Sequence, residues 1–103
     1  MAKKVFKVQL DLSKSVFKIQ VSKGFKFLSA QIQLGVPTFW YEIDADEESL
    51  KTRENVILKL YSTNETMNDI KSEYLGTYLL NHGQNVKHLY RSFDIDQQNN
   101  TTI

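Results

Sequence analysis

The segment PTFWYEID, residues 37–44, predicts the fold because its apolar side chains alternate with the rest. Phe39, Tyr41 and Ile43 fall on one side of an extended chain, and Trp40 falls on the other side between polar neighbours. This alternation is typical of a β-strand that buries one face in a core. We therefore expect a strand that begins just after the proline, with Phe39, Tyr41 and Ile43 facing inward.

The same period of two recurs on both sides of this segment. Six further runs of this kind stand at residues 6–12, 17–21, 25–34, 54–62, 73–81 and 86–95. Seven short strands without an amphipathic helix predict an all-β fold, either a small antiparallel β-sandwich or a partly open barrel. We expect at most one short helical turn, near residues 68–71. We also expect the first two strands to pair as a hairpin through LSKS at residues 12–15.

Two positions interrupt the alternation and predict irregular pairing. In the third run the inward set changes from Phe25 and Phe27 to Leu28 and Ala30, which indicates a β-bulge or a bend between two sheets. Gly76 stands inside the sixth run, where a residue without a Cβ marks a bulge or a close approach of another chain segment. We therefore expect local distortions at both places.

The composition indicates a single globular domain. A chain of 103 residues, 41% hydrophobic and 24% charged, is long enough to bury a core. We expect the domain to span residues 1–95 and to be followed by a frayed polar tail at residues 96–103. The chain has no cysteine, which excludes disulfides and thiolate chemistry. No run approaches the roughly 20 apolar residues of a membrane span, so we expect a cytoplasmic protein that does not contact a membrane.

Charge is distributed unevenly along the chain. Residues 1–41 carry seven lysines and one acid, a net charge of +6, whereas residues 42–103 carry six basic and eleven acidic side chains, a net charge of −5. The whole chain has a net charge of only +1. Such an asymmetry would steer association with a charged partner if the folded strands kept the two halves apart.

An acidic run is the candidate for metal chemistry. The run consists of Glu42, Asp44, Asp46, Glu47 and Glu48, and carboxylate oxygens are the ligands that hard cations prefer. The run lacks the glycine turn and the distal glutamate of a calcium loop, and basic residues follow it closely. We therefore predict a solvated turn with no metal and no other cofactor. The last three of these residues, Asp46, Glu47 and Glu48, remain part of a candidate interaction surface.

Catalytic constellations are missing from the sequence. His82 lies in a predicted turn and His88 lies on the polar side of the last strand. No serine stands in a Gly-x-Ser-x-Gly elbow, and no pair of carboxylates has a spacing that defines a catalytic geometry. We therefore predict that the protein is not an enzyme.

Three lysines on strands raise the alternative of nucleic-acid binding. Lys7, Lys18 and Lys26 lie near aromatic residues in the sequence, and single-strand binders combine such cations with exposed rings on a sheet. The nearby phenylalanines have the inward parity, and the net charge is close to zero, so weak phosphate recognition is expected. Outward lysines also protect exposed strand edges. We therefore expect a protein partner in preference to a nucleic acid.

Three large side chains fall on the outward side of their strands. Two arrangements are open for Trp40: it is either buried between two sheets or exposed beside Ile57 and Tyr61. In the second arrangement these three side chains form an exposed patch, which together with the lysines and carboxylates named above makes the candidate interaction surface. Such a patch would serve either to bind a partner or to join copies of the chain. The oligomeric state stays open at this point.

Several short segments carry a family resemblance. The segments LSAQ (28–31), GVP (35–37), FWYEID (39–44) and YLGT (74–77) occur in an order that resembles a family of small, uncharacterised proteins of tailed bacteriophages and prophages. The resemblance spans most of residues 3–94 and implies an all-β domain without an established activity.

Two departures from this family concern its histidines. The chain has YSTNETMND at residues 61–69, where the family has a loop containing glycine and histidine. It also has Arg91 where the family tends to have a histidine in its last strand. An activity that depended on either histidine is therefore not implied for this chain.

The leading functional hypothesis is a small, non-enzymatic, phage-encoded accessory protein. It would act in the cytoplasm of the host cell by binding a host or viral macromolecule, for instance to inhibit a bacterial enzyme or defence system. One alternative is a minor structural or assembly protein of the virion. A second alternative is a protein that binds a small ligand or a nucleotide in the mouth of a barrel.

Overall fold

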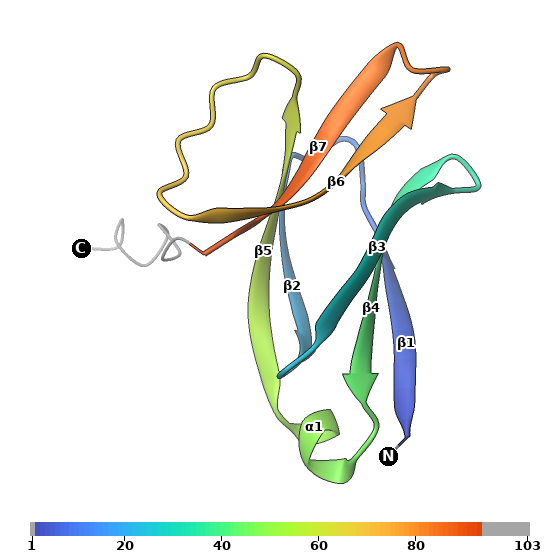
Figure 1. Cartoon of the computed structure of the whole chain (residues 1–103), viewed down its shortest axis with the longest axis vertical. Helices are drawn as coiled ribbons and strands as arrows, with labels where there is room; N and C mark the ends of the chain where they lie inside the picture. The colour runs from blue at the N-terminus through green and yellow to red at the C-terminus, as the bar shows by residue number, and fades with distance from the viewer. Residues whose placement is uncertain (1, 94–103) are drawn as a thin grey trace.

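The computed structural model of the chain describes residues 2–93, which form two antiparallel β-sheets (Figure 1). The elements are β1 (Lys3–Gln9), β2 (Val16–Ser22), β3 (Lys26–Gln33), β4 (Val36–Asp44), α1 (Glu47–Lys51), β5 (Arg53–Ser62), β6 (Ser72–Leu80) and β7 (Asn85–Ser92). The strand order is β1-β4-β3 in one sheet and β2-β5-β7-β6 in the other. The predicted all-β class with seven strands is confirmed, and the sheets do not close into a barrel. The predicted tail, residues 96–103, lies outside the described residues.

The core lies between the two sheets. Phe39, Tyr41 and Ile43 of β4 are buried as predicted, and the rings of Phe39 and Tyr41 lie 5.8 Å apart. The second sheet contributes the buried side chains Val56, Leu58, Leu60 and Leu89. Tyr78 of β6 spans the two layers, because its hydroxyl donates a hydrogen bond of 2.8 Å to the backbone oxygen of Thr38. Burial raises the pKa of Tyr78, so this phenol stays a neutral donor.

The predicted hairpin between the first two strands is wrong. β1 pairs with β4, and β2 pairs with β5, so the connection at residues 10–15 carries the chain from one sheet to the other. Leu10 is buried between the sheets, and its backbone N–H donates to the oxygen of Pro37 at 2.9 Å. The alternation within residues 6–12 predicts an inward position for Leu12 as well, but Leu12 lies in the connection after β1 and is exposed.

The predicted position of the helical turn is also wrong. Residues 68–71 form no helix, whereas the acidic residues after β4, expected to form a turn, lead into the five-residue helix α1. Asp46 stands in the N-cap position, and its backbone oxygen accepts the first helical hydrogen bond from Leu50 at 3.2 Å. A carboxylate before the helix and Lys51 in its last turn both favour this short helix. No helix within residues 2–93 has the length and apolar character needed to cross a membrane.

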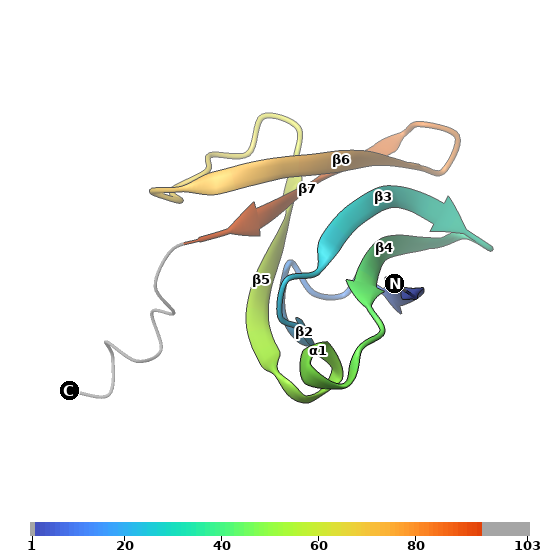
Figure 2. The same ribbon diagram turned by 60° about the horizontal axis from the view of Figure 1, so that its bottom comes forward.

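Both predicted irregularities are confirmed as shifts in strand register. The pairing of β3 with β4 shifts between Phe27 and Ser29, and the pairing of β6 with β7 shifts between Tyr74 and Gly76. The two edge strands β3 and β6 lie against each other without joining into one sheet, and Figure 2 shows β6 passing over β3. At Gly76 an added Cβ would lie only 2.9 Å from the Cβ of Ala30. Glycine at this position therefore allows the two sheets to approach.

The close approach of Gly76 to Ala30 predicts that one added methyl group at position 76 destabilises the fold. Gly76→Ala should lower the free energy of unfolding by about 1–3 kcal/mol, because the new Cβ overlaps Ala30 and forces the sheets apart. Urea denaturation measures the loss. The double variant Ala30→Gly/Gly76→Ala should recover part of it, since it moves the methyl group across the contact. Equal stability of Gly76→Ala and the wild-type chain would contradict the packing described here.

Candidate functional site

The single patch predicted from Trp40, Ile57 and Tyr61 does not form. Trp40 lies opposite Lys7 on the outer face of the three-stranded sheet, where it is partly exposed. Ile57 and Tyr61 alternate with the buried residues of β5 and therefore lie on the outer face of the four-stranded sheet. The alternation assigned each side chain correctly to an outward face. Each sheet has its own outward face, and the two point in opposite directions.

The three lysines of the predicted surface are divided in the same way. Lys7 and Lys26 share the outer face of the three-stranded sheet, and Lys18 lies opposite Ile57 on the other sheet. The ammonium of Lys7 donates to the side-chain oxygen of Gln33 at 2.6 Å. The structure therefore does not gather these lysines into one basic patch.

The basic and acidic halves of the sequence interleave in the fold. Lys3 of β1 lies beside β4, with its Nζ 3.3 Å from Glu42 and 3.9 Å from Asp44. Lys26 of β3 pairs with Glu42 from the other side of β4. The antiparallel pairing of early strands with β4 thus places opposite charges together. The charge asymmetry along the sequence therefore does not become a separation of charge between the sheets.

The predicted carboxylates lie at α1. Asp46 and Glu48 are exposed, and Glu47 is the first residue of the helix. Within residues 2–93, no group of three or more histidine, aspartate or glutamate side chains is arranged to hold a metal ion.

A row of three tyrosines crosses the outer face of the four-stranded sheet. Tyr61, Tyr90 and Tyr74 come from the neighbouring strands β5, β7 and β6. The rings of Tyr61 and Tyr90 meet edge to face at 6.0 Å, and those of Tyr90 and Tyr74 do so at 5.4 Å. Such contacts hold aromatic rings in defined orientations. Tyr74, at the end of the row, is 55% exposed.

His88 extends this row toward the far end of the sheet. Its Nε2 lies 2.9 Å from the hydroxyl of Thr63, and its Nδ1 lies 3.0 Å from the hydroxyl of Thr77. The hydroxyl of Thr77 also bonds to that of Tyr74. Both ring nitrogens of His88 are therefore engaged in holding neighbours, an arrangement that suits a structural role better than a general base.

These side chains define a surface that we call the tyrosine face. It consists of Tyr61, Tyr74, Tyr90, His88, Thr77 and Leu79. Leu79 alternates with the buried Tyr78 and Leu80 and is 61% exposed. The alternation of apolar residues predicts outward positions for both Tyr61 and Tyr90, but it does not show that the two side chains are neighbours. The bulge at Gly76 reverses the alternation within β6, so the sequence alone did not align Tyr74 with them.

The segment between β5 and β6 is held against this face by Asp69. Its side chain is only 2% exposed, and Lys59 Nζ lies 3.1 Å from its Oδ2. The hydroxyl of Tyr61 donates to the other oxygen, and Ser92 supplies a further hydrogen bond. Burial acts to raise the pKa of Asp69, but the hydrogen bonds from Ser92, Tyr61 and Lys59, with the charge of Lys59, outweigh it and lower the pKa. The folded chain thus favours the ionised carboxylate.

This network predicts a pH-dependent contribution to stability. Asp69→Asn should lower the free energy of unfolding at pH 7 by about 1–3 kcal/mol, because it leaves Lys59 without its carboxylate. The pKa of Asp69 is lower in the folded chain than in the unfolded one. Its contribution is therefore complete above about pH 4 and is lost as the pH falls through the lower, folded value.

Urea denaturation of both chains at pH 7 and at about pH 2.5 measures this contribution. The difference between the wild-type chain and Asp69→Asn should be largest at pH 7 and should shrink in acid. Glu48→Gln is the matched control, since it removes one exposed carboxylate and should change stability little. A difference between the wild-type chain and Asp69→Asn that does not depend on pH would contradict the assignment.

The fold and the tyrosine face define a small two-sheet β domain with an exposed aromatic surface. The chain belongs to the family described as "Domain of unknown function (DUF7352)", whose model matches residues 1–99. No curated protein matches the chain, and no solved structure matches it.

Proposed function

We propose that this chain is a non-enzymatic binding protein that recognises a protein partner through the tyrosine face. The proposal is supported above all by one observation, the edge-to-face row of Tyr61, Tyr90 and Tyr74 on an open sheet surface. Tyrosine is enriched at protein interfaces because its ring offers apolar area and its hydroxyl offers a hydrogen bond.

The contacts within the row favour binding because they reduce its entropic cost. A side chain that is mobile before association must be immobilised when the complex forms. Here Tyr90 is held between two rings, and Tyr74 is tied through Thr77 to His88. Leu79 adds an apolar contact beside these polar groups. The surface is thus ordered before a partner arrives.

A nucleic acid is the main competing occupant of this face. Bases stack on exposed rings, but binding of the strand also needs cations that can reach its phosphates. Lys59 is close to the row, and its charge is already engaged by the buried Asp69. Glu65 adds a further acidic side chain in the segment that follows β5. These charges favour a protein partner.

We place the protein among phage-encoded accessory proteins that act in the host cytoplasm. The support is the sequence resemblance described above together with the small size of the domain. The partner in this proposal is a host or viral protein, such as a bacterial enzyme or defence protein that the chain inhibits. Binding rests on the shape and chemistry of the tyrosine face, because strand pairing places Lys3 beside Glu42 and Asp44 and thus brings the basic and acidic parts of the sequence together.

The proposal predicts that two exposed residues matter for binding and little for folding. Tyr74→Ala and Leu79→Ser should each weaken the complex by roughly tenfold or more, because hot-spot side chains at interface centres have effects of this size. Trp40→Ala is the matched control, since it removes a partly exposed aromatic from the opposite sheet.

The experiment has two stages. The tagged chain is first used to purify its partner from infected or lysogenic bacteria, with identification by mass spectrometry. The affinity of the purified partner for each variant is then measured by calorimetric titration, and thermal melting establishes that each variant is folded. A stronger loss with Trp40→Ala than with Tyr74→Ala would overturn the assignment of the face. Salt-sensitive binding of a single-stranded oligonucleotide that Tyr74→Ala abolishes would replace the protein partner by a nucleic acid.

A further inference from the structure

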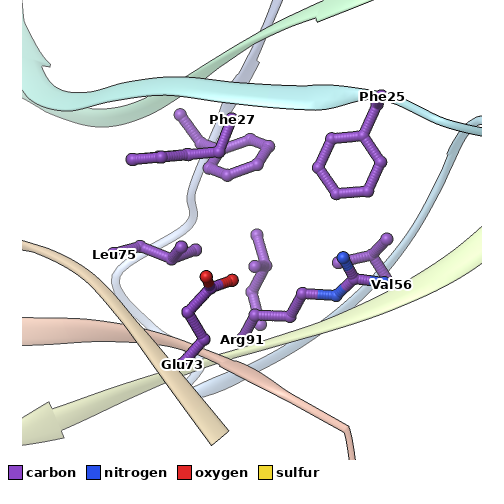
Figure 3. Close-up of a pocket in the computed structure, with 8 residues that line it drawn as sticks. Phe25, Phe27, Val56, Glu73, Leu75 and Arg91 are labelled. Atoms are coloured by element: carbon purple, nitrogen blue, oxygen red, sulfur yellow. The ribbon is translucent and has the colours of Figure 1, made fainter.

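A pocket of about 300 Å³ opens between the two sheets, on the inner side of the strands that carry the tyrosine face (Figure 3). Most of the side chains that line it are apolar. Phe25 and Phe27 cover it from the side of β3, Leu75 lines it from β6, and Val56 and Leu58 line it from β5. A pocket of this size is at the lower limit of those that bind small molecules.

Arg91 enters this pocket from β7. It lies opposite Leu58 in the pairing of β5 with β7, so it has the inward parity of the core. Its guanidinium carbon lies 5.0 Å from the ring centre of Phe25 and 4.5 Å from that of Phe93, and both rings thereby orient the cation. The side chain is 23% exposed, which places its charge at the mouth of an apolar space.

The guanidinium is held in place but keeps donors for a ligand. One oxygen of Glu54 lies 3.7 Å from Nη2 of Arg91, which is an ion pair longer than a hydrogen bond. The other oxygen of Glu54 accepts a hydrogen bond of 3.2 Å from the backbone of Gly24, so this carboxylate is itself anchored. A guanidinium has five N–H donors in a planar fork, and a carboxylate at that distance does not saturate them.

Glu73 supplies an opposite charge on the same wall. It is the direct partner of Arg91 in the pairing of β6 with β7, so the two side chains rise from adjacent strands on the same face. Figure 3 shows the carboxylate of Glu73 and the guanidinium of Arg91 both pointing into the pocket beneath the phenylalanine rings. The pocket therefore combines one cation, one anion and an aromatic roof.

We propose that this pocket binds an apolar α-amino acid in its zwitterionic form. The ligand carboxylate accepts hydrogen bonds from Arg91, and its ammonium group faces Glu73. The ligand side chain lies against Phe25, Phe27 and Leu75. This site is separate from the tyrosine face and lies on the opposite side of the same sheet.

The two charges select this class of ligand over its neighbours. An apolar carboxylate without an ammonium group would satisfy Arg91 but would place its negative charge near Glu73. An apolar amine would have the reverse conflict with Arg91. A nucleotide carries several negative charges, whereas Arg91 is the one cationic side chain among the described residues that line the pocket. A zwitterion with a compact apolar side chain matches all the groups that line the space.

Three related ligands test the proposal on the wild-type chain. L-Phenylalanine should bind saturably, and calorimetry or chemical-shift perturbation should detect it. 3-Phenylpropionate lacks the ammonium group and phenethylamine lacks the carboxylate, and each should bind roughly tenfold more weakly or worse, because each loses a charge-assisted contact.

Variants then assign the contacts to residues. Arg91→Met and Glu73→Gln should each weaken the binding of L-phenylalanine by roughly tenfold, whereas Lys7→Met, which removes a lysine from the opposite outer face, should leave the affinity unchanged. Glu73→Gln should also remove the preference for L-phenylalanine over 3-phenylpropionate. If Arg91→Met does not fold, Arg91→Lys takes its place, since it keeps the charge and loses the planar fork.

Several results would overturn the proposed amino-acid site. The proposal would be wrong if L-phenylalanine showed no saturable binding up to about 20 mM. It would also be wrong if 3-phenylpropionate bound as tightly as the amino acid. Unchanged affinity in folded Glu73→Gln and Arg91→Lys would place any binding elsewhere on the molecule. Tyr74→Ala should not change the affinity for L-phenylalanine. The amino-acid site and the tyrosine face are therefore tested independently of each other.

Discussion

The contact between Ala30 and Gly76 is the constraint on which the arrangement of the two sheets depends. It brings the edge strands β3 and β6 together at a distance that leaves no space for a Cβ at position 76. The shift in register beside Gly76 inserts one extra residue into β6, which turns Leu75 inward and leaves Tyr74 outward. One backbone irregularity therefore positions residues of both the pocket and the tyrosine face.

Strands β6 and β7 have two different surfaces as a result. Their outer surface carries Tyr74 and Tyr90 in edge-to-face contact, and their inner surface carries Glu73 and Arg91 at the pocket. Because successive side chains of a strand point to opposite sides, residues that are adjacent in the sequence line two different surfaces, the outer face and the pocket. The sheet is rigid enough to present both, since its core side chains are almost completely buried.

Much of the fold could be predicted from the alternation of apolar residues, but the assembly of the candidate sites could not. Phe39, Tyr41 and Ile43 are buried as expected, and the irregularity at Gly76 occurs where the glycine predicted it. The patch around Trp40 was not predicted correctly, because outward positions in different sheets look identical in sequence. Arg91 carries a charge and would be assigned to solvent, although it points inward beneath Phe25.

The strand class, the inward face of each central strand and the places where the alternation breaks can all be read from the sequence. These are local properties, because the two sides of an extended chain are fixed by its geometry. The pairing of β1 with β4 and of β2 with β5, and the position of the helix at α1, are seen in the folded chain and not in the pattern. Backbone N–H and C=O groups are the same in every strand, so they do not encode a partner. The choice of partner follows from how all the side chains together fill one core.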